Sequence, residues 1–204
     1  MGEPSDGVDP EKRATLRRFA ALGAAGPLAR LAEGDRSGES DARDAIVGYL
    51  STTPGAHFSK VRDDLSLGTG EAQHHLRRLV EAGVVESFRD GEYRRFVLSG
   101  RFSPQEKRAL GYLRRETPRG MLVALLRDPE TTASDLADRV GVSRPTVSKY
   151  AKELEDAGLL SRTEGYALVD PERLLTLIVR YADSFDGESM ALADDAATLV
   201  RYDP

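Results

Sequence analysis

The sequence contains one stretch of residues twice. FSKVRDDLSLGTGEAQHHLRRLVEAGVVES begins at Phe58, and ASDLADRVGVSRPTVSKYAKELEDAGLLSR begins at Ala133, 75 positions later and without a gap. Apolar positions stay apolar in both copies, as where Leu79 matches Leu154, while the residues between them vary. Because one packing pattern is written twice, the chain is predicted to contain two small domains of the same fold.

Each copy is predicted to form two short helices joined by a tight turn. In the first copy the helices are expected over 59–65 and 69–82, with Ser59 and Thr69 as their N-terminal caps. Gly83 is expected to end the second helix, because glycine adopts a left-handed conformation without steric cost. Two helices joined in this way form a helix-turn-helix unit.

A hairpin is predicted after the first helix-turn-helix, because β-rich runs lie on both sides of Asp90-Gly91. A two-residue loop at this dipeptide gives cross-strand pairs that agree in charge or in apolar character. The expected pairs are Arg89 with Glu92, Phe88 with Tyr93, Glu86 with Arg95, and Val85 with Phe96. With a helix over 41–51 and a short strand over 56–58 before it, this order of elements is that of a winged helix.

Helices are also expected outside the repeated stretch. Ser103 followed by Pro104 predicts the start of a connecting helix over 103–116, which Pro118 is expected to end or kink. The second hairpin is predicted to be short, with Gly165 at its turn.

Asp170-Pro171-Glu172 predicts the start of a C-terminal helix with one apolar stripe. The stripe consists of Leu174, Leu177, Ile178, Tyr181 and Phe185. It is expected either to pack inside the chain or to form a homodimer interface.

The predicted fold class is mainly α with small β hairpins (α+β), with two winged helix-turn-helix domains in tandem and flanking N- and C-terminal helices. The expected divisions are an N-terminal helix and linker over 1–40, a first winged-helix domain over 41–100, a connecting helix over 101–117, a second winged-helix domain over 118–170, and C-terminal helices over 171–204.

The N-terminal segment allows two interpretations. Asp9-Pro10-Glu11 predicts a helix start, a short helix is expected over 28–32, and a polar linker over 33–39. Arg17-Arg18 before an apolar run is also the pattern of a twin-arginine export signal. The alternative is an amphipathic helix that packs on the first domain or on a partner subunit.

Composition limits the possible functions. The net charge is −5, so any contact with nucleic acid must come from local basic patches. Cysteine is absent, which excludes disulfides and thiolate metal sites and fits a cytoplasmic location. No phosphate-binding glycine loop, HExxH motif or nucleophile elbow is present, so neither an enzyme nor a cofactor is predicted. His74 and His75 diverge by about 100° on a helix and cannot hold one metal together.

The longer helix of each copy is predicted to present donors for DNA on the side opposite its apolar face. The candidate DNA-binding residues, with two from the first hairpin, are Gln73, His74, Arg77, Arg78, Arg89, Arg94, Arg144, Ser148, Lys149 and Lys152. Exposed Arg and Lys usually form a solvated face, but their outward placement, the hairpin and the repetition favour DNA binding.

The two copies, with RDGEYRRFVL after the first, resemble the winged helix-turn-helix regulators of archaea, above all haloarchaeal tandem winged-helix proteins with MarR-, ArsR- or TrmB-like domains. The resemblance implies sequence-specific binding of double-stranded DNA, often as a dimer. It places contacts on Gln73, His74, Arg77, Arg144, Ser148 and Lys149, with hairpin contacts at Arg89 and Arg94. ArsR-type metal sensors use cysteine or histidine clusters that this sequence lacks.

The sequence therefore predicts a DNA-binding transcription regulator with two winged helices in one chain. The alternative is a tandem winged-helix scaffold of the kind found in chromosome-segregation or transcription-machinery complexes, which binds proteins rather than DNA. The acidic net charge and the acidic C-terminus are the observations that favour the alternative.

Overall fold

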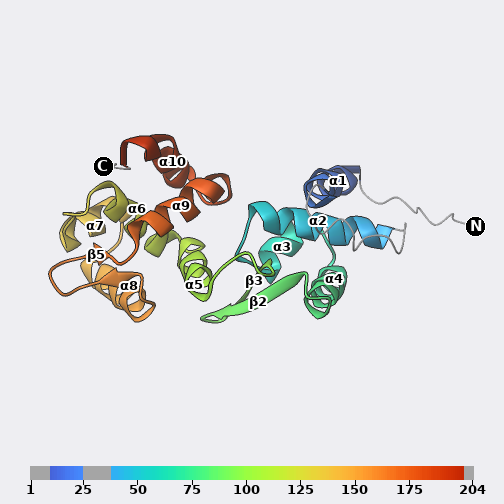
Figure 1. Ribbon diagram of the computed structural model, residues 1–204, viewed down its shortest axis with the longest axis horizontal. Helices are drawn as coiled ribbons and strands as arrows, with labels where there is room; N and C mark the ends of the chain where they lie inside the picture. The colour runs from blue at the N-terminus through green and yellow to red at the C-terminus, as the bar shows by residue number, and fades with distance from the viewer. Residues whose placement is uncertain (1–9, 25–37, 200–204) are drawn as a thin grey trace, which may run out of the picture. The chain divides into compact units, whose positions relative to one another are not determined.

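The computed structural model describes residues 10–24 and 38–199 (Figure 1). The chain divides into two compact units, Met1–Phe102 and Ser103–Pro204. The predicted helix over 28–32 lies outside the described residues, as does most of the predicted linker over 33–39. The two units are called unit 1 and unit 2 below, and each has its own hydrophobic core.

Unit 1 contains four described helices and one small sheet. Its helices are α1 (Pro10–Ala24), α2 (Gly38–Thr52), α3 (Phe58–Asp64) and α4 (Thr69–Glu81). Its strands are β1 (Ala56–His57), β2 (Val85–Asp90) and β3 (Tyr93–Leu98), which form an antiparallel sheet in the order β1-β3-β2. The expected order of helix, short strand, two helices and hairpin is confirmed.

In its described residues, unit 2 has the same order of helices and hairpin but without the short strand, and it adds helices around them (Figure 1). Its repeated part consists of α6 (Glu116–Arg127), α7 (Ala133–Val140), α8 (Arg144–Asp156) and a two-stranded antiparallel sheet of β4 (Leu160–Ser161) and β5 (Ala167–Leu168). The added elements are α5 (Pro104–Leu113), α9 (Pro171–Tyr181), the 3-10 turn η2 (Ala182–Ser184) and α10 (Gly187–Leu199).

The offset found in the sequence is kept in the backbone. The bounds of α4 and α8 differ by 75 positions at both ends. Gly83 and Gly158 follow these helices with φ of +70° and +71°, as expected for glycines that end a helix in the left-handed conformation. The tandem helix-turn-helix fold predicted from the repeat is confirmed.

The predicted caps of α3 and α4 are wrong. His57, not Ser59, caps α3, because its Nδ1 accepts a hydrogen bond from the backbone N–H of Lys60 at 3.3 Å. The N-cap of α4 is Gly68, whose N–H donates to Glu71 at 3.1 Å. A cap must have extended backbone just before the first helical residue, and Ser59 and Thr69 are already helical.

The hairpin forms, but its register differs from the predicted one. Asp90 pairs with Tyr93 and Phe88 with Arg95, so the loop is Gly91-Glu92 and not Asp90-Gly91. Gly91 has φ of +59°, and a positive φ at the first loop residue fits a type II′ turn, which favours glycine there. Asp90 stays in the strand because its carboxylate binds the guanidinium of Arg95, with Nε and Oδ2 2.6 Å apart.

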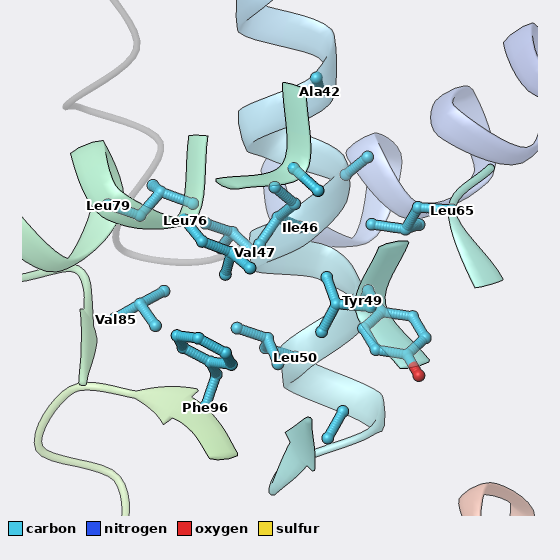
Figure 2. Packing of buried hydrophobic residues seen from close by; sticks show 14 of the residues in the cluster. Ala42, Ile46, Val47, Tyr49, Leu50, Leu65, Leu76, Leu79, Val85 and Phe96 are labelled. Atoms are coloured by element: carbon cyan, nitrogen blue, oxygen red, sulfur yellow. The ribbon is translucent and has the colours of Figure 1, made fainter. Parts of the chain in front are cut away.

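The core of unit 1 lies between α2, α4 and the hairpin. Figure 2 shows Ile46 and Leu50 of α2 pointing toward the side chains of α4 and β3. The side chains that they face include Leu76 on α4 and Phe96 on β3. Ile46, Leu50, Leu76 and Phe96 are all buried. Burial of an aliphatic side chain of this size contributes about 1.5–3 kcal/mol, so the core fixes which side of α4 faces inward.

Helix α1 packs on α2, as one of the two interpretations of the N-terminal segment expects. Leu16 is buried in the core of unit 1, and the ring of Phe19 meets that of Tyr49 edge-on with centroids 5.4 Å apart. Arg17 and Arg18 are exposed beside them. No helix of the described residues is both long enough and apolar enough to cross a membrane.

In unit 2, Pro118 lies in the first turn of α6 and does not end the helix before it. Helix α5 has already ended at Leu113, and α6 begins at Glu116. A backbone N–H in the first turn of a helix has no partner inside the helix, so proline fits there. Ser103 caps α5 as predicted, since its Oγ accepts from the N–H of Glu106 at 3.2 Å.

The apolar stripe of α9 packs inside unit 2. Leu174, Leu177, Ile178 and Tyr181 are all buried, and α9 lies against α5 and α10. Phe185 falls beyond the helix, where its ring lies 4.4 Å from the guanidinium of Arg114. Asp170 caps α9 as predicted, accepting from the N–H of Arg173 at 3.1 Å. The stripe is therefore internal packing.

The turn between α3 and α4 holds a strained serine. Ser66 has φ of +53°, and the matching residue in unit 2 is Gly141 with φ of +69°. A residue with a Cβ costs about 1–2 kcal/mol in this conformation, whereas glycine does not. We expect Ser66→Gly to raise the free energy of unfolding of unit 1 by about 1 kcal/mol, measured by urea denaturation. Gly141→Ser is the matched reverse change and should lower the free energy of unfolding of unit 2. If both substitutions changed this free energy in the same direction, the explanation by strain at Ser66 would be contradicted.

Candidate nucleic-acid interface

The outward side of α4 carries polar side chains, as predicted. Ala72, Leu76 and Leu79 are buried on one side. On the other side Gln73, Arg77 and Arg78 are exposed and His74 is half-buried. The side chain of His75 is buried, and its ring meets that of His74 with centroids 5.2 Å apart.

The hairpin of unit 1 places two arginines side by side. Arg89 and Arg94 are directly opposite each other on β2 and β3, and both are exposed. Directly opposite residues of an antiparallel pair point to the same face, and two like charges there destabilise the hairpin. Arg94 donates from Nε to Ser87 Oγ at 3.0 Å, and no carboxylate of the described residues forms an ion pair with it. A paired cationic site of this kind is suited to a polyanion.

Arg95, by contrast, holds the hairpin in place and does not reach outward. Its side chain is 2% exposed and pairs with Asp90. Its Nη1 also donates to the carbonyl oxygen of Gly55 at 3.0 Å, which ties the hairpin to the turn before β1. Burial lowers the pKa of Arg95 to about 10, so the side chain is still charged at neutral pH. Because its side chain is buried, Arg95 is not available to contact DNA.

His57 joins the hairpin to the start of α3. Besides capping α3, its ring stacks on that of Tyr93, with centroids 5.1 Å apart. Burial lowers the pKa of His57 from its ordinary 6.5, and the nearby charges of Arg95 and Lys60 lower it further, against the opposing effect of Asp63 and Asp64. Neutral His57 is therefore the form that the fold favours.

The pKa of His57 predicts a pH dependence of stability. Because the folded pKa lies below 6.5, the contribution of neutral His57 is present above pH 6.5 and is lost as the pH falls through the folded value. Protonation also removes the acceptor that caps α3. We expect wild-type stability to fall more between about pH 7.5 and pH 5 than that of His57→Asn, which keeps a capping side chain but does not titrate. Parallel urea titrations at the two pH values that show the same fall in both proteins would contradict this.

The outward side of α8 carries the candidates predicted for unit 2. Arg144, Ser148, Lys149 and Lys152 are all exposed, opposite the buried Val147, Ala151 and Leu154. The second hairpin is as short as expected, with Gly165 at φ of +110° in its turn. Its one basic residue, Arg162, pairs with Glu155 through Nη2 and Oε2 at 2.7 Å.

The structure brings the candidates together in two sets, one on each unit. In unit 1, α4 leads through Gly83 into β2, so one continuous segment carries the helix and hairpin candidates. Sequence reasoning missed Arg95 and His57 as residues that position the hairpin. The predicted short strand, which forms at 56–57, could have pointed to both residues. It contains His57, and β3 pairs with it at Arg95 and Phe96. Among the described residues no group of three or more His, Cys, Asp or Glu is placed to hold a metal ion.

Comparison with known proteins gives two domain matches and one relative. Residues 40–110 match a family described as an N-terminal HTH domain, and residues 114–161 match a family described as winged helix-turn-helix DNA-binding. Over 131 residues the chain is 27% identical to an uncharacterized HTH-type transcriptional regulator of Methanocaldococcus jannaschii. That alignment covers 64% of this chain and 33% of the relative, so the chain spans about a third of the relative's length.

No solved structure matches the chain significantly. The first match runs from α2 through the hairpin of unit 1 into α5, and the second covers α6 to β4. The chain therefore carries two helix-turn-helix domains in tandem, and the second of them is similar to a family described as winged helix-turn-helix DNA-binding.

Proposed function

We propose that the chain is a cytoplasmic transcription regulator that binds duplex DNA through its helix-turn-helix units and has no catalytic activity. The observation that carries the proposal is the arrangement of unit 1. The inner side of α4 is fixed by the core, while Gln73, Arg77 and Arg78 face outward. A protein that reads DNA needs donors for base edges and cations for phosphates, and this side supplies both.

The domain matches and the relative support the same proposal. One matched family is described as DNA-binding, and the relative is named as a transcriptional regulator. Neither comparison favours the alternative of a protein-binding scaffold. The proposed domain organisation keeps the winged helices at 41–100 and 118–170, with contacts from the six candidate residues on α4 and the first hairpin.

The proposal includes a homodimer only through a surface other than the apolar stripe of α9. The stripe of α9 is buried inside unit 2 and is not available to a second chain. Two helix-turn-helix units in one chain also offer two DNA-reading surfaces without a partner. Sedimentation of the full chain with and without duplex DNA would give the number of chains bound.

Genome-wide mapping of bound DNA tests the proposal. The wild-type protein is expected to give discrete sites, and Arg77→Ala combined with Gln73→Ala should lose them, because both side chains face outward on α4. Arg18→Ala is a matched control, since it is an exposed arginine of unit 1 on another helix. No enrichment with the wild-type protein would overturn the proposal in favour of the scaffold.

A further inference from the structure

The outward sides of α4 and α8 differ in charge at matched positions. Because the offset between the copies is constant, Arg77 matches Lys152 and Arg78 matches Glu153. Two positions later, Val80 in unit 1 matches Glu155 in unit 2. Unit 2 thus carries two carboxylates where unit 1 has an arginine and an apolar residue.

These two carboxylates lie beside the cations of unit 2. Glu153 Oε1 is 4.0 Å from Lys149 Nζ. Glu155 is hydrogen-bonded by Arg162, and this contact together with the nearby charge of Lys152 lowers the pKa of Glu155. Lys149 and Arg162 therefore each have a carboxylate of their own unit within ion-pair distance, and Lys152 lies near the charge of Glu155. The remaining one, Arg144, donates to Ser134 Oγ at 2.6 Å.

The cations of unit 1 are not neutralised in this way. Within residues 10–24 and 38–199, no ion pair involves Arg77, Arg78, Arg89 or Arg94, and all four side chains are exposed. Asp90, an acidic residue of the same hairpin, pairs with Arg95 and not with Arg89 or Arg94. Unit 1 therefore offers four uncompensated positive charges on α4 and its hairpin.

This difference matters because binding to DNA depends on releasing the counterions that surround the phosphates. Each cation that neutralises a phosphate adds about 0.9 to the slope of log affinity against log salt concentration. A carboxylate beside the cation opposes the approach of a phosphate, because the like charges repel each other. Cations that already have carboxylate neighbours thus contribute little to affinity or to its salt dependence.

We propose that the chain binds the phosphates of duplex DNA mainly through unit 1. Phosphate contacts come from Arg77, Arg78, Arg89 and Arg94, and Lys149 and Lys152 of α8 make none. The inference rests on the function proposed above, and it assigns that function chiefly to one of the two helix-turn-helix units. Unit 2 keeps the helix-turn-helix fold, but Lys149 and Arg162 have carboxylates of their own unit as partners.

Matched double variants of the full chain test the inference. The probe is a fluorescent duplex of random sequence, with binding followed by polarisation from about 50 to about 200 mM salt. With four phosphate contacts the wild-type affinity should fall about 150-fold across this range, and Arg77→Ala/Arg78→Ala should reduce the fall to about 12-fold. Lys149→Ala/Lys152→Ala removes two charges from α8 and should leave the wild-type fall unchanged. All four side chains are exposed, and circular dichroism would verify that both variants stay folded.

Two failures are distinguishable. If the α8 variant reduces the salt dependence as much as the α4 variant, both units contact phosphates and the inference is overturned while the proposed function stands. If the wild-type chain fails to bind DNA even at the lowest salt, the proposed function is overturned and the inference falls with it.

Discussion

Arg95→Met is expected to lower the free energy of unfolding of unit 1 by about 3–5 kcal/mol, because it leaves the carboxylate of Asp90 buried without its cation. The two side chains are 2% and 8% exposed, and Nε and Oδ2 lie 2.6 Å apart. Methionine fills a similar volume but offers no donor to Asp90 or to the carbonyl oxygen of Gly55. The loss should be read as the cost of an unpaired buried charge rather than of a cavity.

Urea denaturation of the full chain measures this effect, with the neighbouring arginine as control. Arg94→Met changes the same residue type one position earlier on β3, but Arg94 is exposed and donates to the hydroxyl of Ser87 rather than to a buried carboxylate. We expect it to cost less than about 1 kcal/mol, as most surface substitutions do. Similar losses for the two variants would show that the buried ion pair does not hold the hairpin.

Arg89→Glu is expected to change stability and DNA binding in opposite directions. A glutamate opposite Arg94 would replace a like-charge pair by an attractive one, which stabilises a hairpin by about 0.2–1 kcal/mol. The same change removes one phosphate contact and occupies Arg94, which takes away a second. Affinity for duplex DNA should therefore fall about ten-fold or more at about 100 mM salt.

Two assays on one protein separate these effects. Thermal or urea unfolding gives the stability, and polarisation with a labelled duplex gives the affinity. Arg62→Glu is the control, since Arg62 is a cation of α3 that Asp63 already binds, with Nε and Oδ1 2.6 Å apart. If Arg89→Glu left the affinity unchanged, the hairpin would not contact DNA.

The helices could be predicted from the sequence because the same pattern of apolar residues occurs in both copies of the repeat. Apolar residues that recur at the same offset fixed the inner sides of α4 and α8, and Gly83 and Gly158 fixed their ends. From the inner side, the outward placement of Gln73 and Arg77 follows by helical geometry alone. These features depend on residues close together in the chain.

The register of the hairpin could not be predicted in the same way. Asp-Gly is a strong local signal for a two-residue loop, and the predicted pairs matched in charge. What decides the register is a contact across the fold, since Arg95 reaches both Asp90 and the carbonyl oxygen of Gly55, 40 positions away. The residues next to Arg95 in the sequence do not indicate such a contact.

The ion pairs on and beside α8 also could not be predicted from local sequence. Lys149 and Arg162 look like further DNA contacts when the basic residues are counted. Their pairing depends on where Glu153 and Glu155 point, and for Arg162 on the return of the chain after α8. The two copies share a fold, but the charges on it have to be read from the structure.

The central claim is that the outward side of unit 1 binds the phosphates of duplex DNA. The most direct test is the affinity of the full wild-type chain for a random-sequence duplex over a salt series starting at about 50 mM. The account predicts binding that weakens as salt rises, with a log-log slope of about −3.6 for four contacts. A chain that does not bind at about 50 mM salt, or that binds with a slope near zero, would contradict it.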